Sequence, residues 1–388
     1  MKKIKNVISF VENLLGKLRK LFVNTLTVLF LMLITFGFLF SLGESLFESD
    51  KVETEDQILY LEPKGVIVDK AILTNDPFEE FEIFESAINQ IELEEFLKII
   101  KNAGTDDELK AIYLDVDGLS AYYTSALKIA DALYEARENG KEIIAFTSGL
   151  GTTGYLMASQ ATEIILEKDT YEPVLPFGFS RVRLYQKDFF ENIKVNMNVY
   201  AAGDFKSGPE GYTRNDMSET DRFAWLEFIT PIWEKYKSKM EIGRGFESGR
   251  IQYIGDNYPL LVSENNGDNN ETSLSTGLVD KLMSEQETRN YLIEKYGSEE
   301  EYERPEGISG REYLSTLKDE DISNKQKRVQ EKNKIAIIHV EGAIVTGNIG
   351  FNTAGSGGIV KKINKARDDE NVKGIVLRVN SPGGDVYA

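Results

Sequence analysis

Two spacings of apolar residues follow one another along most of this chain, and they predict strands that alternate with helices. Short apolar runs predict strands at residues 58–61, 65–68, 111–114 and 143–146. Longer segments with apolar residues every three or four positions predict helices at residues 93–102 and 125–137. Because strands and helices in this order build a mainly parallel sheet covered by helices, the pattern predicts an α/β fold.

The opening pattern occurs a second time near the end of the chain. The segment 335–345 parallels 58–68, with a glycine in register, and the segment 373–380 parallels 110–117. The segments 110–117 and 373–380 each follow a helical stretch. Two matched strand–helix–strand openings predict tandem copies of one α/β domain.

A longer apolar run near the N-terminus predicts a membrane helix. Residues 21–42 contain no charged side chain over 22 positions, and a helix of that length crosses a hydrocarbon core about 30 Å thick. Six basic residues precede the run and acidic residues follow it, so the positive-inside rule places the N-terminus in the cytoplasm. A cleaved signal peptide is the alternative, but the run is too long for one and lacks a small-residue cleavage site.

These patterns divide the chain into successive parts. The polar run 263–273 predicts a surface loop. A second domain that stopped at Ala388 would expose strands that parallel sheets normally bury on both faces, so we expect this copy to be incomplete. The predicted parts are a cytoplasmic basic segment (1–20), a transmembrane helix (21–42), a linker (43–56), a first, complete domain (57–317), a connection (318–333) and the start of a second domain (334–388).

Composition removes several classes of function. The 45 basic and 64 acidic residues give a net charge of −19, which argues against a nucleic-acid partner because phosphate binding requires clustered basic residues. The absence of cysteine excludes disulfides, thiolate metal sites and cysteine nucleophiles. The single histidine, His339, lies in a strand-like run, so we expect a structural role for it and no metal site.

The turn Asn380-Ser-Pro-Gly-Gly-Asp385 follows the last predicted strand. Ligands of open α/β sheets bind at the carboxyl ends of strands. Adjacent glycines let a ligand approach the backbone, so Gly383 and Gly384 could present N–H groups to an oxyanion. An ordinary Pro-Gly turn is the alternative.

The segment Gly203-Asp-Phe-Lys-Ser-Gly208 is a second candidate site. Lys206 stands between glycines and an aromatic residue, a setting in which a lysine can lose its proton and act as a base. A surface lysine is the alternative. Shortly afterwards Ser218 precedes an acidic stretch, which predicts the start of a helix.

A small-residue turn at Ser148-Gly-Leu-Gly-Thr-Thr-Gly-Tyr155 is the third candidate. Its pattern is typical of a strand–turn–helix elbow. Ser148, Thr152 and Thr153 are hydroxyl nucleophile candidates, but the sequence shows no base near them. We therefore expect a degenerate site here.

Taken together, these stretches resemble the long form of signal peptide peptidase A, a serine–lysine protease family. The resemblance rests on the N-terminal apolar run, on 203–208 with Asn215-Asp-Met-Ser218, and on Leu377-Arg-Val-Asn-Ser-Pro-Gly-Gly384. It implies two tandem domains of the Clp-protease/crotonase type, the first supplying Lys206 as general base. The family's serine belongs to a later turn that this sequence does not contain, and the internal repeat places it about 30 residues past Ala388.

The resemblance also implies partners and a location. The family implies a single-pass protein of the inner or plasma membrane, with its main domains on the extracytoplasmic (periplasmic) side. It implies hydrophobic peptide substrates, namely remnant signal peptides, and a homo-oligomer, with no cofactor and no metal. Two alternatives remain, a catalytically inactive pseudoprotease that binds peptides and an acyl-CoA enzyme of the crotonase type. The membrane anchor and acidic charge disfavour the second.

Overall fold

The computed structural model describes most of the chain after residue 56. The residues it describes are 19, 20, 22, 24–27, 30, 32, 57–71, 89–200, 202–297, 304–317, 333–350 and 352–388. Residues 1–53 and residues 54–388 form two separate units. We describe each unit by itself.

The described residues of the first unit are helical and exposed. Most of the predicted membrane helix (21–42) and the whole predicted linker (43–56) lie outside the described residues. Among the residues that are described, no helix combines the length and the apolar character needed to cross a bilayer. The membrane helix therefore stays a prediction.

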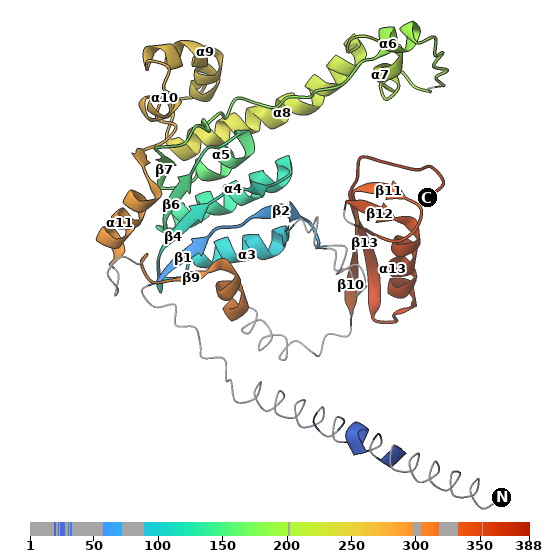
Figure 1. Ribbon diagram of the computed structural model, residues 1–388, viewed down its shortest axis with the longest axis horizontal. Helices are drawn as coiled ribbons and strands as arrows, with labels where there is room; N and C mark the ends of the chain where they lie inside the picture. Colours follow the sequence, from blue (N-terminus) through green and yellow to red (C-terminus); the bar gives the residue numbers. More distant parts are fainter. Residues whose placement is uncertain are drawn as a thin grey trace, which may run out of the picture. The chain divides into compact units, whose positions relative to one another are not determined.

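The described residues of the second unit form thirteen strands and ten helices (Figure 1). The strands are β1 (Gln57–Leu61), β2 (Gly65–Val68), β3 (Gln90–Glu92), β4 (Leu109–Asp115), β5 (Leu119–Ser120), β6 (Glu142–Thr147), β7 (Glu163–Glu167), β8 (Lys281–Met283), β9 (Gly307–Ser309), β10 (Lys334–Glu341), β11 (Ala343–Val345), β12 (Thr353–Gly355) and β13 (Val372–Asn380). The helices are α3 (Leu93–Ala103), α4 (Tyr123–Glu138), α5 (Thr152–Ala158), α6 (Lys187–Asn192), α7 (Glu210–Thr213), α8 (Glu219–Arg244), α9 (Arg250–Glu264), α10 (Asn269–Ser275), α11 (Glu285–Tyr296) and α13 (Ser356–Asp368).

The main sheet has six strands in the order β8-β7-β6-β4-β1-β9, and every neighbouring pair is parallel. Parallel strands need crossover connections, which the helices between them supply. This arrangement confirms the predicted α/β fold with a parallel sheet.

Both faces of the main sheet are covered, as expected of a parallel sheet. Ile143 and Ile164 belong to the large core that also contains buried residues of α3, α4 and α5. Their neighbours Ile144 and Ile165 point to the other face and pack with Leu292 of α11. Successive residues of one strand therefore enter two different cores, because side chains alternate between the faces of a sheet.

The order and pairing of elements recur at the end of the chain. In the early part β1 pairs with β4 and β2 pairs with β3, all in parallel, with α3 between β3 and β4. In the late part β10 pairs with β13 and β11 pairs with β12, again in parallel, with α13 between β12 and β13. These two sets of elements correspond to the segments that repeat in the sequence. The domain boundaries derived from the repeat stay a prediction, and most of the connection (318–332) lies outside the described residues.

One prediction about this part of the chain is wrong. The run 263–273 was expected to be a surface loop, but the end of α9 and most of α10 occupy it. Asp268 starts α10 by accepting hydrogen bonds from the N–H groups of Asn270 and Glu271. Asp268, one of the polar side chains that suggested a loop, therefore serves as a helix cap.

Candidate functional site

The predicted lysine segment belongs to an arm that lies beside the N-terminal end of α8 (Figure 1). We call residues 181–218 the arm; α6 and α7 are its two short helices. Two backbone hydrogen bonds attach α7 to the segment that precedes α6. The N–H of Gln186 donates to the carbonyl of Gly211 at 2.8 Å, and the N–H of Lys187 donates to the carbonyl of Arg214 at 3.3 Å. The opposite, C-terminal half of α8 packs in the main core through Tyr236 and Met240.

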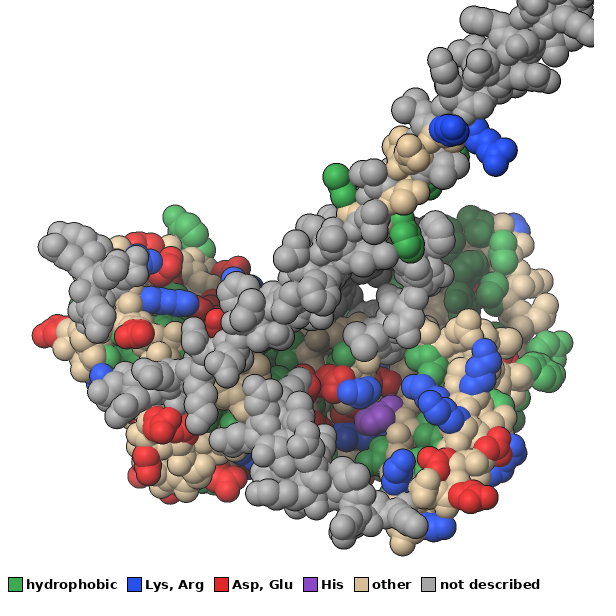
Figure 2. All heavy atoms as spheres, turned by 90° about the horizontal axis from the view of Figure 1, so that it is seen from below, with side chains coloured by type: hydrophobic (Ala, Val, Ile, Leu, Met, Phe, Trp, Pro, Cys, Tyr) green, Lys and Arg blue, Asp and Glu red, His purple; other side chains and the backbone are tan. Residues whose placement is uncertain are grey.

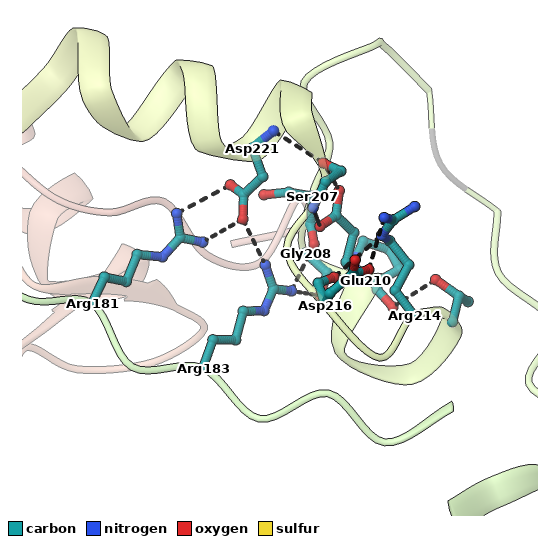
Figure 3. A network of polar contacts seen from close by, with 11 residues as sticks. Arg181, Arg183, Ser207, Gly208, Glu210, Arg214, Asp216 and Asp221 are labelled. Atoms are coloured by element: carbon teal, nitrogen blue, oxygen red, sulfur yellow. Dashed lines mark hydrogen bonds and ion pairs between the residues drawn. The ribbon is translucent and has the colours of Figure 1, made fainter. Parts of the chain in front are cut away.

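Two arginines and one aspartate connect the arm to α8 (Figure 3). Arg181 donates two hydrogen bonds to the carboxylate of Asp221, from Nη1 to Oδ1 at 3.1 Å and from Nη2 to Oδ2 at 3.0 Å. Arg183 donates to the same carboxylate from Nη1 at 3.5 Å. Asp221 thus balances two guanidinium groups of one extended segment.

Arg183 also holds the lysine segment. Its Nη2 donates to the backbone carbonyl of Ser207 at 2.6 Å and to that of Gly208. These are the two residues that directly follow Lys206 in the sequence. The turn after the lysine is therefore fixed through its backbone.

The Asp221 carboxylate is almost completely buried, with 5% of the residue exposed. Burial acts to raise its pKa, but the hydrogen bonds from Arg181 and from the Ser207 side chain, with the charges of both arginines, hold the pKa of Asp221 below its ordinary value. Ionised carboxylates are favoured by such partners. The carboxylate therefore remains charged at neutral pH.

The first turn of α8 forms as the sequence predicted. Ser218 is the N-cap, and its hydroxyl oxygen accepts a hydrogen bond from the N–H of Asp221 at 3.0 Å. Glu210 of α7 accepts from the N–H of Ser218 at 3.2 Å and from its hydroxyl at 2.5 Å. Asn215 exchanges two hydrogen bonds with Asp188 at the start of α6. The motif Asn215–Ser218 thus connects both short helices of the arm to α8.

Lys206 itself is exposed. Its backbone N–H donates to the carbonyl of Gly203 at 3.3 Å, and Gly203 has a φ of +96°, a conformation that glycine adopts without strain. Its neighbour Phe205 is 63% exposed. The resemblance implied a desolvated lysine, but the described residues leave the Lys206 side chain in solvent.

The second predicted site lies at the end of β13. Gly383 has a φ of +108°, and its N–H donates to the hydroxyl of Ser381 at 3.1 Å. A Cβ on Gly384 would lie 2.0 Å from the carbonyl oxygen of Ile344, so only glycine fits there. In the part of the chain that the structure describes, no hydrogen bond uses the Gly384 N–H. Of the two predicted oxyanion donors, Gly384 is the one whose N–H group is available.

The third predicted site, the small-residue turn before α5, is built around Asp117. The Asp117 carboxylate accepts from the Thr147 hydroxyl at 2.5 Å and from the N–H and hydroxyl of Ser148 at 2.6 and 2.7 Å. Local sequence patterns did not reveal an acid beside Ser148, because Asp117 lies 31 residues earlier. These three hydrogen bonds fix Thr147 and Ser148 against Asp117 at the end of β6.

The other two hydroxyls of this turn are also engaged in the fold. Thr152 donates to the carbonyl of Gly178 at 2.7 Å. Thr153 hydrogen-bonds with the hydroxyl of Tyr236, which itself donates to the carbonyl of Tyr123 at 2.9 Å. Both hydroxyls therefore join this turn to neighbouring segments, and the degenerate site stays a prediction.

His339 lies half-buried in β10, and its Nδ1 atom is buried with no hydrogen-bond partner among the described residues. Figure 2 shows the histidine among basic and acidic side chains on one face. It borders a cavity of about 230 Å³ whose other lining residues are Lys70, Ala71, Glu341, Ile349, Ala354, Ile359 and Lys362. Burial raises the pKa of Glu341. This cavity contains none of the residues that the sequence singled out for chemistry.

Among the described residues, no hydrogen bond or ion pair joins the lysine segment to the turn at Gly383 and Gly384. Nor do three or more His, Asp or Glu side chains of the described residues gather as they would around a metal ion.

Sequence reasoning missed the residues that hold the lysine segment. Arg181 and Arg183 lie in an extended run. Their spacing of two positions was the only sign in the sequence that both side chains point to the same side. Asp221 was assigned only to the first turn of a helix. Its contacts with the two arginines span 40 and 38 residues, a separation at which local patterns carry no signal.

Comparison with known proteins places this arm within a peptidase domain. Residues 135–297 match peptidase family S49. The chain is 26% identical over 386 residues to Protease 4 of Haemophilus influenzae, covering 98% of this chain and 61% of that protein. It is 29% identical over 385 residues to Protease 4 of Salmonella typhi, covering 96% of this chain and 59% of that protein.

A plant relative gives the same family. The chain is 24% identical over 311 residues to the chloroplastic serine protease SPPA of Arabidopsis thaliana, covering 79% of this chain and 43% of that protein. The chain thus spans at most 61% of the length of these relatives. Residues 135–297 thus match peptidase family S49, and the chain is similar over nearly its whole length to proteins named Protease 4.

Proposed function

We propose that this chain is the lysine-bearing part of a serine endopeptidase of the signal peptide peptidase A type, with Lys206 as its general base. One observation carries the proposal. Within the region that matches peptidase family S49, Lys206 extends freely from a segment whose backbone is fixed by Arg183. A base must be held in place while its own reactive atom stays accessible to the partner group.

The proposed mechanism uses a serine–lysine pair. The neutral amine of Lys206 takes the proton of a serine hydroxyl as the oxygen attacks a peptide carbonyl, forming an acyl-enzyme and releasing the amine product. Water then attacks the acyl-enzyme and regenerates the serine. The N–H of Gly384 is the proposed donor to the oxyanion. The relatives are longer than this chain, and we propose that the serine belongs to residues after 388.

The substrates we propose are hydrophobic, extended peptides, including remnant signal peptides in a membrane. The arm carries many exposed apolar side chains, such as Val182 at 95%, Leu184 at 70% and Tyr200 at 96% exposure. An apolar surface of this kind fits apolar peptides, a membrane or further copies of the chain in a homo-oligomer. We propose that residues 21–42 anchor the protein as a single-pass helix, with the N-terminus cytoplasmic and the main domains extracytoplasmic.

A peptide-binding pseudoprotease is the second candidate. The exposure of Lys206 favours it, because a lysine base is expected in a site shielded from water and no described residue shields this side chain. The hydrogen-bonded hydroxyls of Ser148 and Thr152 also favour it, since neither is poised to attack a substrate.

Substitution of the lysine distinguishes the two candidates. Lys206→Met in the protein that includes the expected serine should lower kcat for an apolar peptide by about 100-fold or more, because general bases contribute at least that much. Lys194→Met is the matched control, since Lys194 is also an exposed lysine of the arm. Unchanged peptide cleavage in Lys206→Met would reject the serine–lysine mechanism. Peptide binding without cleavage in the unaltered protein would favour the pseudoprotease.

A further inference from the structure

The contact between Arg183 and the lysine segment has an uncommon form. One nitrogen, Nη2, reaches two consecutive backbone carbonyls, those of Ser207 and Gly208. Backbone carbonyls cannot rotate independently of the chain, so holding two in succession fixes the orientation of that stretch of backbone. The Cα–Cβ direction of Lys206, immediately before them, is set with it.

The side chain that grips the segment is itself held. Arg183 is 19% exposed and Asp221 is 5% exposed, so both groups are mostly shielded from competing water. A guanidinium group is planar and rigid, and its donors point in fixed directions. The other nitrogen, Nη1, faces the Asp221 carboxylate at 3.5 Å. The group therefore bridges a helix on one side and the lysine segment on the other.

The helix provides a stable reference for this bridge. Asp221 lies in the first turn of α8, a helix of 26 residues. Further along α8, Tyr236 and Met240 are completely buried in the main core. Side chains packed in a core move little, because protein interiors are close-packed. The bridge thus ties the lysine segment to the rigid body of the domain.

We propose that Arg183 and Asp221 form a positioning clamp that sets the direction in which Lys206 leaves its segment. This role rests on the proposed function of Lys206 as general base. Arg183 and Asp221 act through the lysine and touch no substrate. Arg181 binds the same carboxylate through two hydrogen bonds but forms no hydrogen bond with the described residues of the lysine segment, so it provides a matched comparison.

Kinetics of the serine-bearing protein test the clamp. Arg183→Lys should lower kcat by about 100-fold with KM changed less than about two-fold. The compact ammonium group lacks the planar fork that spans the two carbonyls and the carboxylate, and a base misplaced by about 1 Å is slower by about that factor. Arg181→Lys removes a bidentate contact from the same Asp221 and should lower kcat by less than about five-fold. Equal losses in the two variants would overturn the clamp, since both would then report only the weakened Asp221 cluster.

Backbone hydrogen exchange of this chain gives a second test that needs no activity. Amide exchange across residues 203–210 should become faster in Arg183→Lys and stay near the original rate in Arg181→Lys. The N–H groups of Lys206, Ser207 and Glu210 report here, because each donates within the segment. Unchanged exchange in Arg183→Lys would contradict the clamp, provided that the melting temperatures of both variants match.

The two levels of the proposal fail differently. Full activity in Lys206→Arg would reject both the proposed role of Lys206 as general base and the clamp that depends on it. An inactive Lys206→Arg with a fully active Arg183→Lys would leave the base in place and reject the clamp alone.

Discussion

Removing the charge of Asp221 should destabilise this protein more than removing any exposed carboxylate of the arm. Asn in its place keeps the shape of the side chain and the backbone N–H that Ser218 caps. It loses the negative charge, however, and replaces one acceptor oxygen by an NH₂ donor that faces a guanidinium group. Arg181 and Arg183 would then lie beside each other without a counter-charge.

The size of the effect follows from burial. Removing one partner of a fully buried ion pair costs about 3–5 kcal/mol. Asp221 is 5% exposed, but Arg181 and Arg183 are 28% and 19% exposed and can recover some hydration. We therefore expect the free energy of unfolding to fall by about 2–3 kcal/mol at pH 7, below the full value for a buried pair.

The effect should depend on pH in one direction. The pKa of Asp221 in the folded protein lies below its ordinary value of 3.8, because the arginine and serine hydrogen bonds outweigh burial. Its carboxylate therefore contributes stability above the pKa of the unfolded chain and loses it as pH falls through the lower, folded pKa. The difference between the original protein and Asp221→Asn should be complete at pH 7 and shrink at pH values below about 4.

Urea unfolding of this chain at pH 7 and at pH 3.5 measures both quantities. The midpoint should shift at pH 7 with an unchanged slope. Asp216→Asn is the control, because Asp216 also pairs with one arginine, Arg214, but its side chain is 75% exposed; its loss should stay within about 1 kcal/mol. Equal midpoints for Asp221→Asn and Asp216→Asn would refute the reasoning from burial.

Three further changes test other parts of the fold. Burial raises the pKa of Asp115 to about 6, so stability should fall as pH rises from about 4 to 6, and Asp115→Asn should flatten that change in melting temperature. Tyr155→Phe should lower the free energy of unfolding, measured in urea, by about 1–2 kcal/mol. The buried Tyr155 hydroxyl donates to the Leu278 carbonyl at 3.0 Å, and its removal leaves that carbonyl without this hydrogen bond. Gly384→Ala should speed amide exchange at Ile344, since the added Cβ would lie 2.0 Å from the Ile344 oxygen; protection equal to that of the original protein would contradict this.

Local apolar patterns predicted the early elements well because those elements are decided by short stretches of sequence. The helix expected at 93–102 is α3, Leu93–Ala103, and its apolar positions face the core. The strand expected at 111–114 is the centre of β4, Leu109–Asp115. In both cases the side chains that define the pattern are the ones that the fold buries.

Polar stretches were harder to interpret. The run 263–273 was taken for a loop because Asn, Asp and Ser favour turns, yet the same side chains start and brace helices. Thr272 and Ser273 are completely buried, and their hydroxyls donate to carbonyls four residues earlier. Composition alone cannot distinguish these two uses of a polar side chain.

The candidate site likewise has one feature that local sequence could predict and one that it could not. Lys206 could be singled out because its neighbours in sequence are unusual. The fixing of its segment by Arg183 could not, because an arginine in an extended run has no local feature that marks its partner. Contacts of this kind depend on the path of the whole arm, which hydrophobic periodicity does not determine.

The pairing of β1 with β9 has a consequence for how the protein is made. The hydroxyl of Tyr60 in β1 donates to the carbonyl of Pro305, 245 residues later, and the N–H of Ile58 donates to Glu306. At about 5–20 residues per second, a ribosome needs roughly 12 to 50 s to synthesise that interval. Throughout this time one edge of β1 lacks its final neighbour, and unpaired edges invite association with other chains. Completion of the main sheet therefore waits until β9 has been synthesised, and protection by chaperones before that point matters most for β1.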